Sequence, residues 1–381
     1  MTDPAPVALT LSRPDSDRFG LLVFRANAAD IDSRTLFEAI VGNAADIVIL
    51  RVPAGTHPEL QQLGRYALHP IHADTLVYYQ LPLADIEPNA PRNQDLEFSE
   101  VNEGDAIELD ALVTAAFSGY VSHYHANPRL DPARILEGYA QWASGYLADK
   151  GRGSIAWVAR RQGVMLAFIC CRHDPQQETC EVVLNGVHPD HWRGGIYTDL
   201  LRYTQGEYRR RGYRSMRIST QIWNYAVQKV WNREGFSLDQ AFDTFHINAM
   251  LSAGEMLVER GLVLGIEGVA RLGSDTADAK AFAREDAAAH RAATVPLVAQ
   301  GVLANGELSR ILATEIARLG AELVSADVAL LEPIQPGRTH TLQIRGLFRA
   351  DSSGCIPTVI TIRDSAGSLC LLCYSDLMKK H

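Results

Sequence analysis

The sequence has no apolar run long enough to cross a membrane. Its longest such run, residues 164–171, is far shorter than the roughly 18 residues that a spanning helix needs. The opening residues, MTDPAPVALTL, contain neither a basic segment nor a long hydrophobic one, so they do not resemble a secretory signal. We therefore expect a soluble, cytoplasmic protein without a membrane partner.

Cysteine is scarce, with six residues in a chain of 381. A disulfide scaffold needs a denser pattern and an oxidising compartment, so free thiols are expected. Cys370 and Cys373 form a CxxC pair inside the apolar run LCLLCY, where strand alternation sends the two side chains to opposite faces. Because no second Cys/His pair stands at ligand spacing, the pattern favours a buried strand over a zinc or redox site, and we expect no metal.

Positive charge is also in deficit. The chain has 36 Lys and Arg against 45 Asp and Glu, a net charge of -9, and no long basic stripe. Nucleic-acid binding depends on concentrated positive charge, so DNA and RNA are excluded as main partners. With 29 Gly, 17 Pro and 47% hydrophobic residues, the composition is that of an ordinary globular protein, whose length suits two or three domains.

Hydrophobic periodicity divides the chain into three predicted domains. Residues 1–91 form a small α/β half-domain, and the linker DIEPNAPRNQD leads into a second α/β domain at residues 92–250. Residues 255–381 contain an amphipathic helix followed only by strands, which predicts an α+β sheet wrapped on one helix. Gly320 ends that helix, and the residues that line its apolar face are Leu308, Ile311, Leu312, Ile316 and Leu319.

The most informative stretch is VVLNGVHPDHWRGGIYTDLL, a predicted strand, loop and helix. Such a unit presents unpaired backbone N–H groups and the positive end of a helix dipole to whatever lies above the loop. Gly194 and Gly195 let the backbone approach a bulky phosphate closely. The sequence therefore predicts an anion site, with a glycine pair that serves only packing as the alternative.

A second motif follows about thirty residues later. Asn224, Ala226, Trp231, Gly235 and Phe236 have the order N-x-A-x4-W-x3-GF. With this motif, residues 96–248 resemble the GNAT superfamily of acyl-CoA-dependent N-acyltransferases. The preceding segments RPDSDRFG, ILRVPAG and ADTLVYYQLPL resemble the N-terminal half-domain of the TDP-fucosamine acetyltransferase group. The resemblance implies a GNAT fold, acetyl-CoA or another acyl-CoA as donor, and the amine of a nucleotide-linked amino-deoxy sugar as acceptor; a non-sugar amine is the alternative.

The resemblance also implies that the backbone of residues 193–198 holds the coenzyme's pyrophosphate and that the strand edge at residues 184–187 pairs with its pantetheine arm. Trp231 stands where the family commonly has a tyrosine that protonates the departing thiolate. An indole cannot act as an acid near neutral pH, so the proton must come from water, the substrate or another side chain. Trp192 and Tyr197 also depart from the family pattern, which has Gln or Arg and a small residue there. The coenzyme-binding residues implied are Leu184, Val187, His188, Trp192, Arg193, Gly194, Gly195, Ile196, Tyr197, Thr198, Asn224 and Trp231.

The acceptor side is predicted from the loop GYVSHYHANPR, between the first two helices of the middle domain. Attack of an amine on a thioester needs positioning, an N–H donor at the carbonyl, and a base. His123 is the predicted base because the ordinary pKa of histidine lies near working pH. Tyr120, Tyr124 and His125 are the predicted walls for a sugar ring. The alternative is a loop of partly exposed aromatic residues.

The C-terminal part resembles the hotdog fold, in particular the MaoC-like hydratases and dehydratases, through DAKAFAREDAAAHRAATVPLVAQGVLANGELSRIL and SADVALLEPIQPGRTHTLQI. The resemblance implies that Asp286 and His290 catalyse water addition to an enoyl thioester. They stand four positions apart, without the Asn-Pro of the family motif, and so can share one helix face. We expect this domain to form a homodimer and to bind or hydrate an acyl thioester. The alternative is a domain that only dimerises the transferase or docks an acyl carrier.

Overall fold

The computed structural model describes residues 7–148, 153–263, 306–332, 334, 337–347 and 355–379. The chain divides into two compact units, one of residues 50–56 and 71–246 and one of residues 1–49, 57–70 and 247–381. We call them the middle unit and the outer unit. The predicted domain boundaries near residues 91 and 250 stay a prediction. Within the described residues, no helix combines the length and apolar character that crossing a membrane would need.

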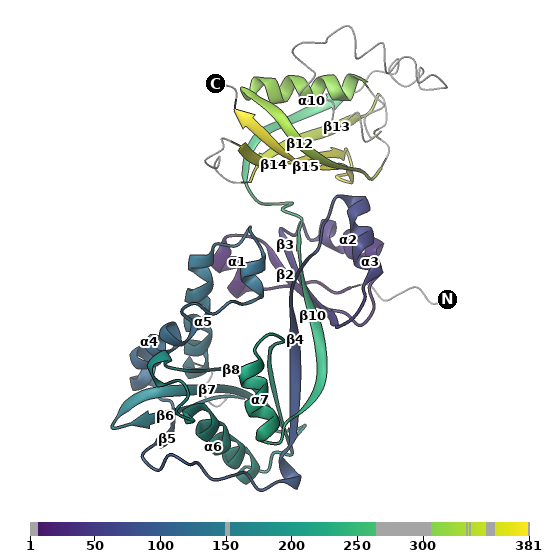
Figure 1. The fold of residues 1–381 in the computed structure, drawn as a ribbon. Helices are drawn as coiled ribbons and strands as arrows, with labels where there is room; N and C mark the ends of the chain where they lie inside the picture. Colours follow the sequence, from purple (N-terminus) through teal and green to yellow (C-terminus); the bar gives the residue numbers. More distant parts are fainter. Residues whose placement is uncertain are drawn as a thin grey trace. The chain divides into compact units, whose positions relative to one another are not determined.

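The middle unit is built on a mixed sheet (Figure 1). Neighbouring strands are antiparallel except for β8 and β9, which run parallel. In the order in which they pair, the strands are β10 (Ser237–Asn248), β4 (Ile71–Pro82), β9 (Ser215–Gln221), β8 (Thr179–Val187), β7 (Val164–Asp174), β6 (Ser154–Arg161) and β5 (Glu97–Glu100).

Helices cover both faces of this sheet, and alternation along β6 shows how. Trp157 belongs to the core cluster that contains Leu200 of α6 and Trp231 of α7, whereas Val158 belongs to the cluster that contains Leu112 of α4. Successive strand residues point to opposite faces, so each face has its own core. The helices of this unit are α4 (Ala106–Phe117), α5 (Pro132–Ala148), α6 (Ile196–Arg210) and α7 (Tyr225–Arg233), with short 3-10 turns η2 (Leu83–Asp85), η3 (Glu103–Asp105), η4 (His123–Ala126) and η5 (Pro189–His191).

The outer unit joins the beginning of the chain to its end through Asp46. This buried carboxylate accepts hydrogen bonds from the backbone N–H groups of Leu22 (2.8 Å), Ser252 (2.7 Å) and Ala253 (2.8 Å). Its N-terminal elements are β1 (Thr10–Leu11), α1 (Arg13–Phe19), β2 (Val23–Asn27), α2 (Ser33–Gly42), the first part of β3 (Ile47–Pro53), α3 (Pro58–Gln61) and η1 (Gln62–Tyr66).

The C-terminal part of this unit is a five-stranded antiparallel sheet, with α10 as the one helix among its described residues (Figure 1). The predicted amphipathic helix is confirmed: Leu308, Leu312 and Ile316 lie in the core, and Gly320 follows the helix with φ of 66°. The predicted buried strand around Cys370 and Cys373 is confirmed as β15, with both thiols buried. The elements are β11 (Glu255–Val263), α10 (Gly306–Arg318), β12 (Ala321–Leu330), β13 (Thr339–Gly346), β14 (Cys355–Asp364) and β15 (Leu369–Lys379).

Candidate functional site

The pairing between strands β8 and β9 ends about halfway along the two strands. Their parallel ladder runs from the pair Thr179/Ser215 to the pair Val182/Ile218 and ends there, while β8 continues to Val187. On its other side β8 stays paired with β7 as far as Val187. The side of β8 that faces β9 therefore has backbone groups that β9 does not pair over residues 183–187, which is the edge predicted to bind pantetheine.

The loop that follows β8 has the backbone expected of an anion cradle. Gly195, with φ of 75°, is the N-cap of α6, and no side chain caps the helix there. Arg193 also has a positive φ of 68°, a conformation that costs free energy in a residue with a side chain. The first N–H groups of α6 and the positive end of its dipole thus remain available to a ligand.

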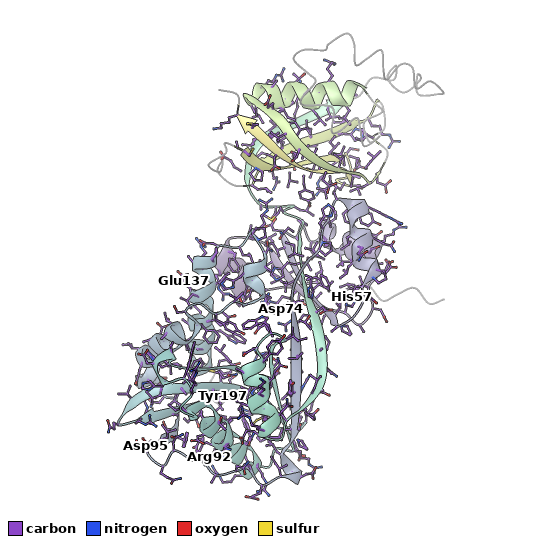
Figure 2. All side chains as sticks on the ribbon, in the orientation of Figure 1. His57, Asp74, Arg92, Asp95, Glu137 and Tyr197 are labelled. Atoms are coloured by element: carbon purple, nitrogen blue, oxygen red, sulfur yellow. The ribbon has the colours of Figure 1, made fainter. Side chains whose placement is uncertain are left out.

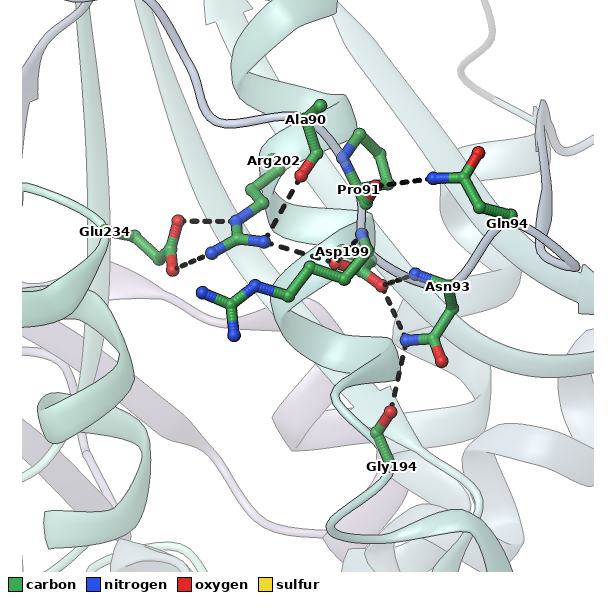
Figure 3. A network of polar contacts seen from close by, with 9 residues as sticks. Ala90, Pro91, Asn93, Gln94, Gly194, Asp199, Arg202 and Glu234 are labelled. Carbon is green, nitrogen blue, oxygen red and sulfur yellow. Dashed lines mark hydrogen bonds and ion pairs between the residues drawn. The ribbon is translucent and has the colours of Figure 1, made fainter.

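A buried polar network supports the backbone of this loop (Figure 3). Asp199, in the first turn of α6, accepts hydrogen bonds from the backbone N–H groups of Arg92 and Asn93, both at 2.9 Å, and from the Asn93 side chain at 2.6 Å. The same Asn93 amide donates to the Gly194 carbonyl at 3.1 Å. The linker before β5 therefore fixes the orientation of the Gly194 peptide.

The network continues to α7 through a buried ion pair. Arg202 of α6 donates from Nε and Nη2 to both carboxylate oxygens of Glu234, at 2.8 Å each, and from Nη1 to the Ala90 carbonyl at 3.3 Å. Each of these charged side chains is 5% exposed. This two-pronged geometry suits a guanidinium facing a carboxylate, and it ties α6 to the end of α7.

The remaining coenzyme-binding candidates lie around this loop in different ways. The Trp231 indole is fully buried and donates to the Tyr197 hydroxyl at 2.7 Å, so two of the three departures from the family pattern contact each other. Burial raises the pKa of Tyr197. Trp192 is exposed and donates to the Val187 carbonyl at 3.1 Å. The others lie near them: Leu184 is buried, His188 caps η5, Ile196 is buried at the start of α6, Thr198 is in its first turn, and Asn224 precedes α7.

On the acceptor side, the structure ties the predicted loop to the end of β9. The Tyr120 hydroxyl donates to Oε1 of Gln221, the last residue of β9. Burial raises the pKa of Tyr120 to about 12. His125 is exposed, and its Nδ1 accepts a hydrogen bond from the Ser122 N–H at 3.1 Å, so the ring caps η4. Tyr124 stacks at a tilt on His123, with ring centroids 4.0 Å apart.

His123 is buried and belongs to a chain of hydrogen bonds that sequence reasoning missed. The Arg129 N–H donates to Oδ1 of Asn127 at 3.0 Å, which turns the Asn127 amide nitrogen toward Nδ1 of His246 at 3.2 Å. His246 must then carry its proton on Nε2, which lies 2.8 Å from Nδ1 of His123. In the neutral pair, His123 therefore holds its own proton on Nε2. Its role as base stays a prediction, and it requires these rings to exchange protons.

Asp286 and His290 lie outside the described residues. Within the residues that the structure describes, no group of three or more His, Cys, Asp or Glu is arranged to hold a metal ion. Sequence reasoning missed Asp199, Asn93 and Asp74, which is described below. Each of these side chains faces residues far away along the chain, and no local pattern marks them.

The model of the acetyltransferase (GNAT) family matches residues 118–236. These residues therefore form an acetyltransferase domain of the GNAT type, a family whose acyl donor is acetyl-CoA or another acyl-CoA.

Among curated proteins, the chain is similar to the spore coat polysaccharide biosynthesis protein SpsD of Bacillus subtilis (strain 168), 22% identical over 220 residues that cover 56% of this chain and 72% of SpsD. Among solved structures, it is similar to a GCN5-related N-acetyltransferase from Sphaerobacter thermophilus, with 15% identity, a TM-score of 0.45 and coverage of 63% of this chain and 75% of that one. It is also similar to PaiA N-acetyltransferase from Thermoplasma acidophilum in complex with coenzyme A, with 14% identity, a TM-score of 0.33 and coverage of 40% and 97%.

Proposed function

We propose that the protein is an N-acyltransferase that moves an acyl group from acyl-CoA to the amine of a nucleotide-linked amino-deoxy sugar. The observation that carries the transferase part is the separation of β8 from β9 beside an uncapped, positive-φ loop at the start of α6. An open strand edge suits the amides of pantetheine, and free N–H groups at a helix start suit a pyrophosphate.

The chain's own residues have defined tasks in this proposal. The coenzyme, when bound, supplies the thioester whose carbonyl carbon is attacked. The backbone of residues 193–198 holds its pyrophosphate, and Asn93 and Asp199 keep that backbone in place. The free N–H groups of β8 after Val182 orient the thioester and polarise its carbonyl, which is the largest electrostatic task in acyl transfer.

A sugar acceptor is supported by the resemblance of the N-terminal half-domain and by the similarity to SpsD, a spore coat polysaccharide biosynthesis protein. The test is release of free coenzyme A thiol from acetyl-CoA across a panel of nucleotide-linked amino sugars, with polyamines and amino acids as the non-sugar arm. Turnover with an amino sugar at least tenfold above every non-sugar amine supports the proposal. Turnover confined to a non-sugar amine favours the alternative acceptor and leaves the transferase assignment standing.

We place Tyr120, Tyr124, His123 and His125 at the acceptor. If His123 is the base, His123→Ala lowers turnover more at neutral pH than at high pH, where the amine is already deprotonated. Equal losses at both pH values would reject that role and leave His123 as a buried hydrogen-bond donor. The hydrogen-bond chain through His246 favours the second outcome.

For the C-terminal part we propose a hotdog domain that binds or hydrates the acyl thioester and forms a homodimer. Support comes from the five-stranded antiparallel sheet with α10 as its one described helix and from the exposed edge that such a sheet must cover. Incubation of the full chain with crotonyl-CoA tests water addition, and light scattering tests the dimer. A dimer that adds no water supports the alternative of a structural or carrier-docking domain.

A further inference from the structure

Asp74, on β4, is a carboxylate whose hydrogen bonding is incomplete (Figure 2). Within the described part of the chain, its Oδ1 is buried and has no hydrogen-bond partner. An ionised oxygen that has left water without gaining a donor costs free energy, and such groups persist in proteins where they have a task. Asp74 is therefore placed to receive a further donor, in addition to the side chains of Thr244 and Gln221 that lie beside it.

A second carboxylate close by shows what complete hydrogen bonding looks like in the same sheet. Asp243, on β10, accepts hydrogen bonds from the Thr75 hydroxyl at 2.5 Å, from the Gly55 N–H at 3.1 Å and from the His72 ring at 3.2 Å. It lies beside Thr75 in the pairing of β10 with β4, one position from Asp74. The same two strands thus carry one carboxylate with hydrogen bonds to both oxygens and one whose hydrogen bonding is incomplete.

The position of Asp74 relates it to the place where β8 and β9 separate. The last pair between β4 and β9 joins Leu76 to Gln221, and the next N–H, that of Ile222, donates to the Thr75 carbonyl at 2.8 Å. Asp74 is the following residue of β4, at the end of β9. The Gln221 side chain accepts from the Tyr120 hydroxyl and also acts on the charge of Asp74, so Asp74 shares a cluster with the predicted acceptor site.

We propose that Asp74 binds the ammonium group of the acceptor amine and takes one of its protons, an inference that rests on the proposed transferase function. The carboxylate accepts a proton from R–NH3+, and the freed nitrogen lone pair attacks the thioester carbonyl. The C–N bond forms, the C–S bond breaks, and the sulfur leaves with the electron pair. A second proton passes from the nitrogen to that sulfur, and Asp74 returns its proton to solvent. The products are the amide, the free thiol and one proton.

The surroundings of Asp74 suit this task. Burial raises its pKa above the ordinary value for aspartate, which brings the carboxylate closer to the proton affinity that a base needs. Thr244 of β10, Gln221 of β9, and the positive charges of Arg51 and His72 act in the other direction and keep the group able to ionise. Among the described residues, the hydroxyls of Tyr120 and of Tyr139 on α5 also feel its charge.

The test uses the full-length chain with acetyl-CoA, a dTDP-linked amino-deoxy sugar, and the same sugar nucleotide with a hydroxyl in place of the amine. Asp74→Asn is compared with Asp243→Asn, a matched change on the neighbouring strand. In the wild type we expect the amine to bind at least tenfold more tightly than the hydroxyl analogue. Asp74→Asn should remove that preference and lower kcat about 100-fold, the usual contribution of a general base. Asp243→Asn should keep the preference, and both variants should bind acetyl-CoA like the wild type.

The outcomes separate the two hypotheses. If the wild type neither binds acetyl-CoA nor releases thiol with any amine, the proposed function fails. If it transfers the acyl group and Asp74→Asn keeps both kcat and the amine preference, the Asp74 assignment is overturned and the transferase remains. Should Asp74→Asn not fold, Asp74→Glu replaces it: a retained preference with reduced kcat supports the assignment, and wild-type values for both overturn it.

Discussion

Two buried polar clusters in the middle unit differ in how fully their charges are matched. Behind the glycine loop, Asp199 receives three hydrogen bonds at 2.9 Å or less, and Arg202 is matched by Glu234 on two atoms. At the end of β9, Asp74 keeps one buried oxygen without a donor among the described residues. We call these the loop-support network and the Asp74 cluster.

The contrast separates two uses of buried charge. A fully matched network has nothing to offer a ligand, and its effect is to fix the backbone in front of it. An incompletely matched carboxylate lowers the stability of the empty protein and gains most when a cation arrives. On our proposal, the support network preorganises the coenzyme side of the site, whereas the acceptor side keeps a carboxylate oxygen available for the ammonium group.

The largest effect is expected from breaking the loop-support network at its ion pair. Glu234→Gln removes two charge-assisted hydrogen bonds from the buried Arg202 guanidinium and leaves it the longer contact with Asp199 at 3.5 Å, which should cost about 2–3 kcal/mol in the free energy of unfolding. Denaturant unfolding measures it. The control is Arg210→Ala, which removes an exposed partner of Glu207 and should change stability little. Equal effects of the two variants would mean that the buried ion pair contributes no more to stability than the exposed one.

Next in size is a change at the loop itself. Gly195→Trp puts a bulky side chain at the start of α6 and should weaken acetyl-CoA binding more than tenfold, or about 1.4 kcal/mol, in a protein that still folds. Gly212→Trp is the matched control, because Gly212 also has a positive φ, of 87°, but follows the other end of the helix. Calorimetry gives both affinities. Unchanged affinity in folded Gly195→Trp would reject the pyrophosphate site.

These two predictions also show what sequence could and could not supply. The glycine pair and the apolar repeat after Gly195 are local signals, and the helix they predict is present as α6. The helix α1, by contrast, has no apolar repeat, and we predicted none there. The contact of Asn93 with Asp199 spans 106 positions and that of Tyr120 with Gln221 spans 101. Such pairs depend on strand order, which periodicity does not specify.

A smaller effect should come from Asn93, which connects the loop-support network to the loop. Asn93→Ala removes the side-chain hydrogen bonds to the Gly194 carbonyl and to Asp199. It should raise the KM for acetyl-CoA about fivefold, in line with about 1 kcal/mol for the bond that orients the loop. Gln94→Ala is the control, because that exposed side chain bonds only the Pro91 carbonyl in the network drawn in Figure 3.

A truncated donor shows whether Asn93 acts through the pyrophosphate. S-acetyl-N-acetylcysteamine has the thioester and part of the pantetheine arm but no phosphate, so Asn93→Ala should leave its kcat/KM unchanged. A loss with both donors would point to general disturbance of the fold, and the positioning role of Asn93 would be abandoned.

The smallest effects are expected in the pH dependence of stability. They test the contrast between the loop-support network and the Asp74 cluster most directly. The folded-state pKa of Asp74 is raised by burial, so folding takes up protons and stability falls as pH rises from the unfolded value through the folded one. Burial opposes ionisation of Asp243 too, but hydrogen bonds from Thr75, Gly55 and His72 outweigh it and lower the pKa; its contribution is present above the unfolded value and is lost as pH falls through the folded one.

At neutral pH the two Asn variants should therefore shift stability in opposite directions. Asp74→Asn removes a poorly solvated charge and should raise the melting temperature by a few degrees, whereas Asp243→Asn removes a well-bonded carboxylate and should lower it by a similar amount. Because its pKa is raised, Asp74 in the folded state takes up its proton earlier on acidification than an ordinary aspartate does, so the gain from Asp74→Asn should shrink between neutral pH and pH 4. Thermal melts at both pH values measure this. If Asp74→Asn destabilises the protein at neutral pH as much as Asp243→Asn does, Asp74 is a structural group like Asp199. The distinction between the fully hydrogen-bonded loop-support network and the Asp74 cluster then does not hold.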